Sequence, residues 1–163
     1  MAAGAVEEGV CLLEFADRKM LETELAQLKR HLKAEIVPGQ SPHSDLLQDE
    51  LKKYFIGMQK TFTVPIVAPG SPFQAKVWAG LRRIPYGSTR SYQEQARFLE
   101  MPNAVRAVAR ANGANRISII IPCHRVIGSD GNLVGYGGGL WRNKYLLELE
   151  RKNRCSRFPE PKI

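Results

Sequence analysis

The sequence contains three cysteines among 163 residues, and no two of them form a Cys-x-x-Cys pair. A set this sparse and odd in number argues against a disulfide framework and against a zinc site built on cysteine pairs. The three cysteines, Cys11, Cys123 and Cys155, are therefore not expected to form disulfides. This fits a cytoplasmic protein, because a reducing environment would keep the Cys123 thiol free. No metal and no cofactor are expected.

Long apolar runs are also missing. No stretch of about 18 apolar residues occurs, so we expect no membrane-spanning segment. The first residues, Met1–Glu8, lack the basic and apolar regions of a secretory signal. Apolar residues make up 44% of the chain and charged residues 25%, which is typical of a globular protein with one domain or two small ones.

Acidic residues are scarce in the middle of the chain. Residues 71–127 contain nine Lys or Arg and two Asp or Glu, a net charge of +7, whereas residues 1–70 have a net charge of −2. A basic block of this kind fits a phosphate backbone, because Lys and Arg attract phosphates and release counterions. A solvated basic face that aids solubility has the same composition, so charge alone leaves both interpretations open.

The sequence predicts an α/β (α+β) fold in two parts. Pro69–Gly70 marks the expected boundary between an N-terminal domain, residues 1–69, and a mainly helical domain over 70–155, with a tail over 156–163. The first part is expected to be a small sheet with helices and no catalytic constellation. Its predicted elements are a hairpin over 1–16, an amphipathic helix over 19–34, a helix from an N-cap at Ser44 to Gly57, and an extended stretch over 62–67.

The second part begins with two capping boxes, Ser71–Gln74 and Ser91–Glu94, each of which predicts a helix start. A further helix is expected over 103–112, with Gly113 as the C′ residue, the left-handed residue that follows the helix end. The helix after Ser91 and the helix over 103–112 are joined by a short link, which predicts a helix-turn-helix.

The helix over 103–112 is unusually slim. Four alanines leave it with a narrow surface, from which Arg106 and Arg110 project. A packed alanine-rich helix with two solvated arginines is one interpretation. A recognition helix that seats in a DNA groove is the other, and it gains weight because the cysteine motif follows directly.

The most informative stretch is Ile117–Arg125. Its β-branched run predicts a short buried strand that Pro122 must end, so the chain turns and presents the Cys123 thiol at the edge of a core. A thiol attacks as its thiolate and needs a base or cation, for which His124 and Arg125 are local candidates, although the base can also come from elsewhere. A buried structural cysteine is the alternative.

Two more features follow this motif. Gly135–Gly139 is a glycine-rich loop around Tyr136 that lacks the Lys-Ser/Thr of a P-loop and better suits a wall for a planar base. The last helix, Trp141 to about Arg151, is expected to turn Glu150 inward. A buried carboxylate needs a partner, and a histidine is a natural one; a surface glutamate near a helix end is the alternative.

Several of these motifs, in this order, resemble the O6-alkylguanine-DNA alkyltransferases, or methylated-DNA–protein-cysteine methyltransferases. The matching segments, within about Gly70 to Glu150, are Phe73–Trp78, Ile84–Gly87, Ser91–Gln93, Ala104–Val108, Asn115, Ile121–Val126 and Gly135–Tyr136. The resemblance implies a DNA-repair monomer that flips out an O6-alkylguanine from double-stranded DNA. It implies irreversible transfer of the alkyl group, usually methyl, to the protein's own cysteine in a single turnover.

The resemblance also implies roles by motif position. Cys123 would accept the alkyl group, His124 would act on it through a water, and Glu150 would orient the histidine. Asn115 would tie the helix-turn-helix to the active-site turn, and Tyr92 would crowd the target phosphate and bond the flipped base. The DNA-binding residues would be Ser91, Tyr92, Arg106, Ala107 and Arg110, with Arg106 filling the vacated space, and the substrate pocket would comprise Asn112, Val126, Tyr136 and Gly137.

The sequence departs from the family pattern in three respects. The family's first strands would begin before residue 1, so we expect a short form or a fragment of a longer protein. The zinc that some relatives carry has no ligand set here. Position 137 is glycine where some relatives carry serine, so the resemblance implies only a backbone contact there.

Two other functions compete with this interpretation. Alkyltransferase-like proteins keep the fold but replace the nucleophile, and the intact Cys123 argues against that class. A thiol hydrolase or peroxidase using Cys123 and His124 would leave the arginine block and the helix-turn-helix unexplained.

Overall fold

The structure is a computed structural model that describes residues 1–154. Its elements are β1 (Ala2–Val6), β2 (Gly9–Glu14), α1 (Leu21–Leu32), α2 (Pro42–Phe55), α3 (Pro72–Leu81), β3 (Arg90–Ser91), α4 (Tyr92–Phe98), the 3₁₀ turn η1 (Pro102–Ala104), α5 (Val105–Gly113), the 3₁₀ turn η2 (Cys123–Arg125), β4 (Val126–Ile127) and α6 (Leu140–Asn153). This mixture of helices and small sheets confirms the predicted fold class. Cys155 and the predicted tail, 156–163, lie outside the described residues.

The N-terminal elements follow the predicted order. β1 and β2 pair antiparallel as the expected hairpin, and α1 packs Leu28 against β2. The prediction of Ser44 as the N-cap of α2 is wrong, because Ser41 caps the helix and Ser44 occupies the third helical position of a capping box. The reason is Pro42, whose fixed φ suits the first helical position and therefore starts the helix directly after Ser41.

The helix-turn-helix is formed by α4 and α5. Ser71 and Ser91 cap α3 and α4 with the predicted capping boxes. The prediction for Gly113 is wrong: this residue is the last of α5, and Ala114 forms the C-cap with an ordinary φ of −85°. The chain therefore leaves α5 without the left-handed residue that a glycine would have supplied.

The isoleucine run is a buried turn, so the predicted strand is wrong. Ile117 forms one parallel bridge with Leu13, and the chain then reverses, with the Ile121 N–H donating to the Ile117 carbonyl at 3.0 Å. Ile119 has a φ of 73°, in the left-handed region that β-branched residues avoid. The Ser118 N–H donates to the Leu13 carbonyl at 2.8 Å, so the run joins β2 at one bridge and then turns away from it.

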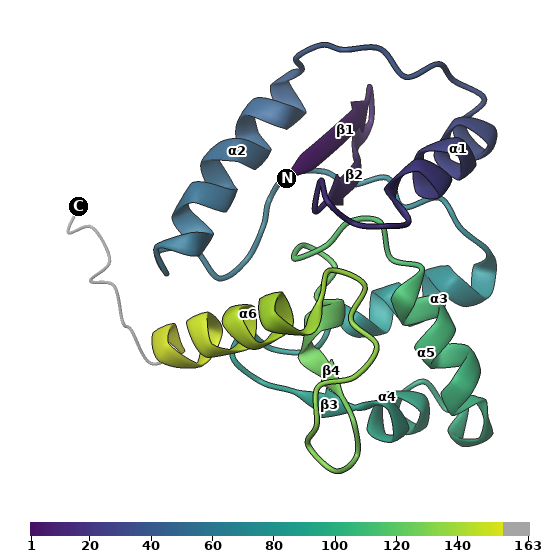
Figure 1. The fold of residues 1–163 in the computed structure, drawn as a ribbon, viewed down its shortest axis with the longest axis vertical. Helices are drawn as coiled ribbons and strands as arrows, with labels where there is room; N and C mark the ends of the chain where they lie inside the picture. Colours follow the sequence, from purple (N-terminus) through teal and green to yellow (C-terminus); the bar gives the residue numbers. More distant parts are fainter. Residues whose placement is uncertain (155–163) are drawn as a thin grey trace.

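Residues before and after Pro69–Gly70 share one hydrophobic cluster. This cluster combines residues of β2, α2 and the extended stretch with residues of α3, α5 and the active-site turn, among them Val10, Leu13, Leu47, Val64, Val77, Trp78, Val108 and Ile121. In Figure 1 the hairpin, α1 and α2 form the upper half and α3–α5 the lower half, and α6 runs from the left toward the centre below α2. The division into two domains stays a prediction. Within residues 1–154 no helix is long and apolar enough to cross a bilayer.

Candidate active site

Cys123 begins the turn η2, directly after the buried isoleucine turn, and only 8% of its surface is exposed to solvent. The Asn115 amide nitrogen donates to Cys123 Sγ at 3.2 Å and to the Ile121 carbonyl at 2.8 Å. The Asn115 oxygen accepts from the Ile117 N–H at 2.9 Å. One buried amide therefore holds both ends of the turn and points a donor at the sulfur.

Burial controls the ionisation of this thiol. Loss of solvent raises the pKa of Cys123 to about 11, and the hydrogen bond from Asn115 lowers the pKa by less than burial raises it. The thiol is therefore protonated at neutral pH, and a base must take its proton before the sulfur attacks.

The reaction of Cys123 with iodoacetamide is expected to speed up about tenfold per pH unit between pH 7 and 10, because only the thiolate reacts and its fraction grows with pH. The rate is read by mass spectrometry of the peptide that contains residue 123, with the Cys123→Ser variant as the blank. A plateau below pH 9 would contradict the raised pKa.

Glu150, from α6, is fully buried, and its carboxylate accepts hydrogen bonds from several segments of the chain. His124 Nε2 lies 2.9 Å from its Oε1, and Arg125 donates through Nε and Nη2 at 2.9 and 2.8 Å. Tyr54 OH donates at 2.7 Å and the Gly87 N–H at 2.9 Å. Burial alone would raise the pKa of Glu150, but the bonds from His124 and Arg125 hold it well below its usual range, so the carboxylate is charged.

His124 is fully buried beside this carboxylate. Burial holds the pKa of His124 below its ordinary value, although the bond to Glu150 favours the charged ring. A neutral ring that donates from Nε2 leaves Nδ1 as an acceptor, and within residues 1–154 Nδ1 has no hydrogen-bond partner. The histidine is therefore oriented by Glu150 and keeps a lone pair that can take a proton.

Cys123 lines a pocket that contains all four predicted substrate residues. Its lining is Arg18, Tyr92, Asn112, Gly113, Asn115, Cys123, Val126, Gly135, Tyr136 and Gly137. Burial raises the pKa of Tyr136 by more than the contact with Ser118 lowers it, so the Tyr136 hydroxyl carries a proton. Within residues 1–154 no group of three His, Cys, Asp or Glu side chains could hold a metal ion.

The predicted DNA-binding residues lie on the helix-turn-helix, outside this pocket except for Tyr92. Arg106, Ala107 and Arg110 are exposed on one face of α5, while Val108, Ala111 and Asn112 face the core. Ser91 is half-buried because its hydroxyl accepts from the Glu94 N–H as the cap of α4. The basic face of α5 and the thiol are thus linked through the end of the helix, where Asn112 and Gly113 enter the pocket.

Several functional contacts could not be predicted from the sequence. Arg125 was a candidate cation for the thiol, but it binds Glu150 and the Ile84 carbonyl. The sequence predicts no catalytic constellation in the N-terminal part, and this part contributes two side chains to the site: Arg18 lines the pocket and Tyr54 donates to Glu150. Two signals were available: Glu14, which ends a fully buried strand four residues before Arg18, and an inward tyrosine on α2 whose hydroxyl needs a partner.

Comparison with known proteins places these features in a family. Residues 72–152 match the family model described as 6-O-methylguanine DNA methyltransferase, DNA binding domain. A methylated-DNA–protein-cysteine methyltransferase from Methanosarcina mazei is 43% identical over 145 residues, which is 87% of this chain and 91% of the relative. One from Mycobacterium tuberculosis is 53% identical over 103 residues, 63% of this chain and 62% of the relative, so the match spans less than two thirds of that protein.

Solved structures agree with the sequence matches. The crystal structure of Mycobacterium tuberculosis OGT in complex with DNA has a TM-score of 0.78 at 38% identity, covering 93% of this chain and 86% of that one. The O6-methylguanine-DNA methyltransferase of Pyrococcus kodakaraensis has a TM-score of 0.66 at 29% identity, covering 89% and 88%. The chain therefore belongs to the methylated-DNA–protein-cysteine methyltransferase family.

Proposed function

We propose that this protein repairs double-stranded DNA by binding it through α5, flipping out an O6-alkylguanine and transferring the alkyl group once to Cys123. The observation that carries the proposal is the pocket itself, which joins the end of the basic helix to a buried thiol. The names of the relatives support the same activity. We further propose that the chain acts as a monomer, with its DNA-binding unit beginning after Pro69–Gly70.

The DNA-binding step uses the exposed face of α5. Arg106, Ala107 and Arg110 present two cations and a small side chain, which suits a narrow groove lined by phosphates. The alkyl carbon is buried in the base stack, so the nucleotide must leave the duplex at a cost of a few kcal/mol. Arg106 is proposed to fill the vacated space, and Tyr92, at the start of α4, to crowd the target phosphate and bond the flipped base. Ser91 is proposed to contact the DNA.

The transfer step follows from the buried side chains. His124, oriented by Glu150, takes the Cys123 proton through a water, and the thiolate attacks the alkyl carbon. The S–C bond forms as the bond from carbon to O6 breaks, and the guanine needs a proton. Tyr136 is proposed to donate this proton to the guanine. The proton that His124 took from the thiol then returns to the Tyr136 oxygen, so the atoms and charges balance. The pocket walls at Asn112, Val126 and Gly137 would hold the base, with Asn115 fixing the sulfur.

The product explains why one turnover is expected. S-alkylcysteine is a stable thioether, and none of the described groups in the pocket is a nucleophile placed to remove its alkyl group. Each protein molecule is therefore consumed as it repairs one base.

The test is the intact mass of the protein before and after mixing with a duplex that contains one O6-methylguanine. We expect a gain of one methyl group per wild-type molecule and none in the Cys123→Ala variant. DNA binding without a mass change would instead indicate a non-catalytic binding module. Neither binding nor a mass change, together with repeated turnover of an acyl or peroxide substrate, would favour a thiol hydrolase or peroxidase.

A further inference from the structure

The connection between β2 and α1 forms a wall of the pocket, although it belongs to the N-terminal part of the chain. Glu14 is fully buried and accepts from the Ser118 hydroxyl at 2.9 Å, next to the active-site turn. It also pairs with Arg18. Arg18 in turn binds Glu24 at 2.8 Å and the Gly113 carbonyl at 3.0 Å. This charged network therefore reaches from the hairpin to the end of the recognition helix.

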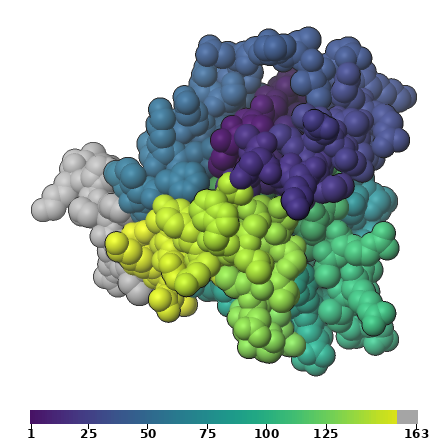
Figure 2. Space-filling model, in the orientation of Figure 1, coloured from purple at the N-terminus to yellow at the C-terminus, as the bar shows by residue number. Residues whose placement is uncertain are grey.

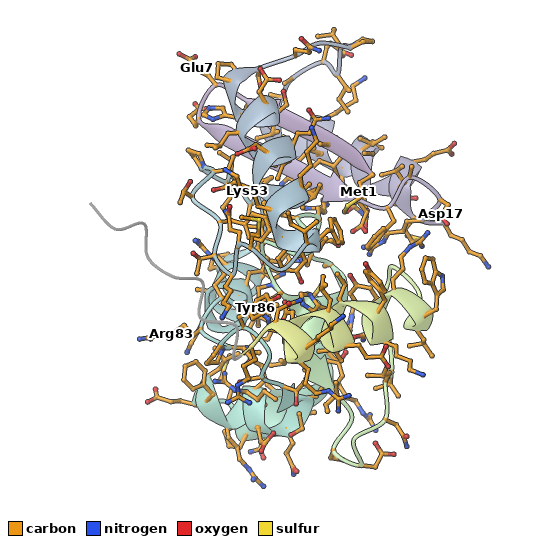
Figure 3. All side chains as sticks on the ribbon, turned by 90° about the vertical axis from the view of Figure 1, so that its left-hand side faces the viewer. Met1, Glu7, Asp17, Lys53, Arg83 and Tyr86 are labelled. Atoms are coloured by element: carbon orange, nitrogen blue, oxygen red, sulfur yellow. The ribbon has the colours of Figure 1, made fainter. Side chains whose placement is uncertain are left out.

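The glycine-rich loop lies directly on this wall. A Cβ atom placed on Gly137 would be 2.7 Å from both Cζ and Nη2 of Arg18, and one on Gly138 would be 2.6 Å from the Phe15 ring. Arg142 strengthens the contact, since its guanidinium lies 4.5 Å from the centre of the Phe15 ring and donates to the Gly138 carbonyl at 2.9 Å. Figure 2 shows the dark blue N-terminal segment seated on the yellow-green loop, and Figure 3 places Asp17 above the start of α6.

Arg18 is held too firmly to yield to a larger neighbour. Its side chain is 8% exposed, and three acceptors, on Glu14, Glu24 and Gly113, fix its guanidinium. The backbone of Gly137 is not in the left-handed region, in contrast to that of Gly135 and Gly139. The guanidinium of Arg18, and not backbone strain, therefore excludes a side chain at position 137.

We propose that Arg18 is a specificity-determining residue, which sets the width of the pocket and so limits the size of the alkyl group that Cys123 can receive. The proposal rests on the function proposed above. Arg18 touches two walls of the pocket at once, the end of α5 at Gly113 and the loop at Gly137, and Cys123 lines the same pocket. A bulky substituent on the base can enter only if these walls separate, and that requires the guanidinium to give up a charged hydrogen bond.

The first test compares duplexes carrying O6-methylguanine or O6-benzylguanine, with the second-order rate constant of alkyl transfer as the readout. Arg18→Met keeps a stem of similar length without the fixed guanidinium. We expect the benzyl-to-methyl rate ratio to rise about tenfold or more, since a pocket discriminates by about that factor for a small change in size. Arg116→Met is the matched control: it removes another buried arginine, bonded to Gln27 and the Pro69 carbonyl outside the pocket, and should leave the ratio unchanged.

The second test uses position 137 and does not depend on the folding of the Arg18 variant. Gly137→Ser in the wild-type background should slow methyl transfer at least about tenfold, because the serine meets the fixed guanidinium. The double variant with Arg18→Met should recover most of this loss. Equal loss of both rates in Arg18→Met, or a fully active Gly137→Ser protein, would overturn the proposal. Absence of methyl transfer in the wild type would instead refute the proposed function.

Discussion

Glu150→Ala is expected to lower the free energy of unfolding by about 3–5 kcal/mol and to abolish alkyl transfer. This loss of stability is large because removing one partner of a buried ion pair leaves the other charge buried without a partner or water. Here the stranded group is Arg125, whose Nε and Nη2 both donate to the carboxylate. His124 would also lose the acceptor that orients it. The measurement is urea denaturation at pH 7.

Glu148→Ala is the control, since Glu148 lies on the same helix with its side chain 58% exposed. It should change the stability by less than about 0.5 kcal/mol. The wild type also provides a pH test. The pKa of Glu150 is lower in the folded than in the unfolded chain, so its contribution is present above the ordinary pKa of about 4.3 and is lost as the pH falls. The stability difference between the wild type and Glu150→Gln should shrink from pH 5 to pH 2, and a difference that stays constant would count against the charged carboxylate.

Asn115→Asp is expected to slow alkyl transfer at pH 7 by a factor on the order of 100. Aspartate has the shape of asparagine and can still accept from the Ile117 N–H, but it cannot donate to Cys123 Sγ or to the Ile121 carbonyl. A carboxylate beside the sulfur also repels a thiolate, and each unit by which the thiol pKa rises removes about nine tenths of the thiolate. Iodoacetamide reactivity of Cys123 against pH reads the pKa directly, and single-turnover transfer gives the rate.

Asn112→Asp separates this hydrogen bond from a general effect of charge. Asn112 is buried in the same pocket, but its amide donates to the Cys123 carbonyl at 3.4 Å and not to the sulfur. Asn112→Asp adds the same charge to the pocket but removes no hydrogen bond to the sulfur. We therefore expect a clearly smaller rise in the pKa of Cys123 than in Asn115→Asp. A transfer rate of Asn115→Asp within fivefold of the wild type would show that the amide contributes little to the reactivity of the sulfur.

Local patterns predicted those parts of the fold whose signals lie within a few residues. The capping boxes at Ser71 and Ser91 each place donor and acceptor three residues apart, so both helix starts were predicted correctly. The inward position of Glu150 followed from its spacing to Leu146 and Leu147, and its burial confirms it. The isoleucine run was wrongly predicted to be a strand, because β-branched residues favour strands. In the structure, burial and hydrogen bonds within the turn hold Ile119 in the left-handed region.

Contacts between distant segments could not be predicted in the same way. Arg18 and Gly137 are far apart in the chain, and neither residue carries a local sign of the other. Tyr54 is buried on α2, but the pattern of this helix says nothing about which acceptor its hydroxyl meets 96 residues later in the chain. The roles of the site residues stay predictions that the variants above can test.

The position of Glu150 near the end of the chain leads us to expect a fixed order of folding events during synthesis. Its donors on Tyr54, Gly87, His124 and Arg125 all precede it in the chain, so the ribosome makes them before their common acceptor. Until Glu150 emerges, burying Arg125 would leave an uncompensated cation in the core. A nascent chain that has passed β4 but lacks α6 is therefore expected to keep its cysteine turn open to water until α6 docks.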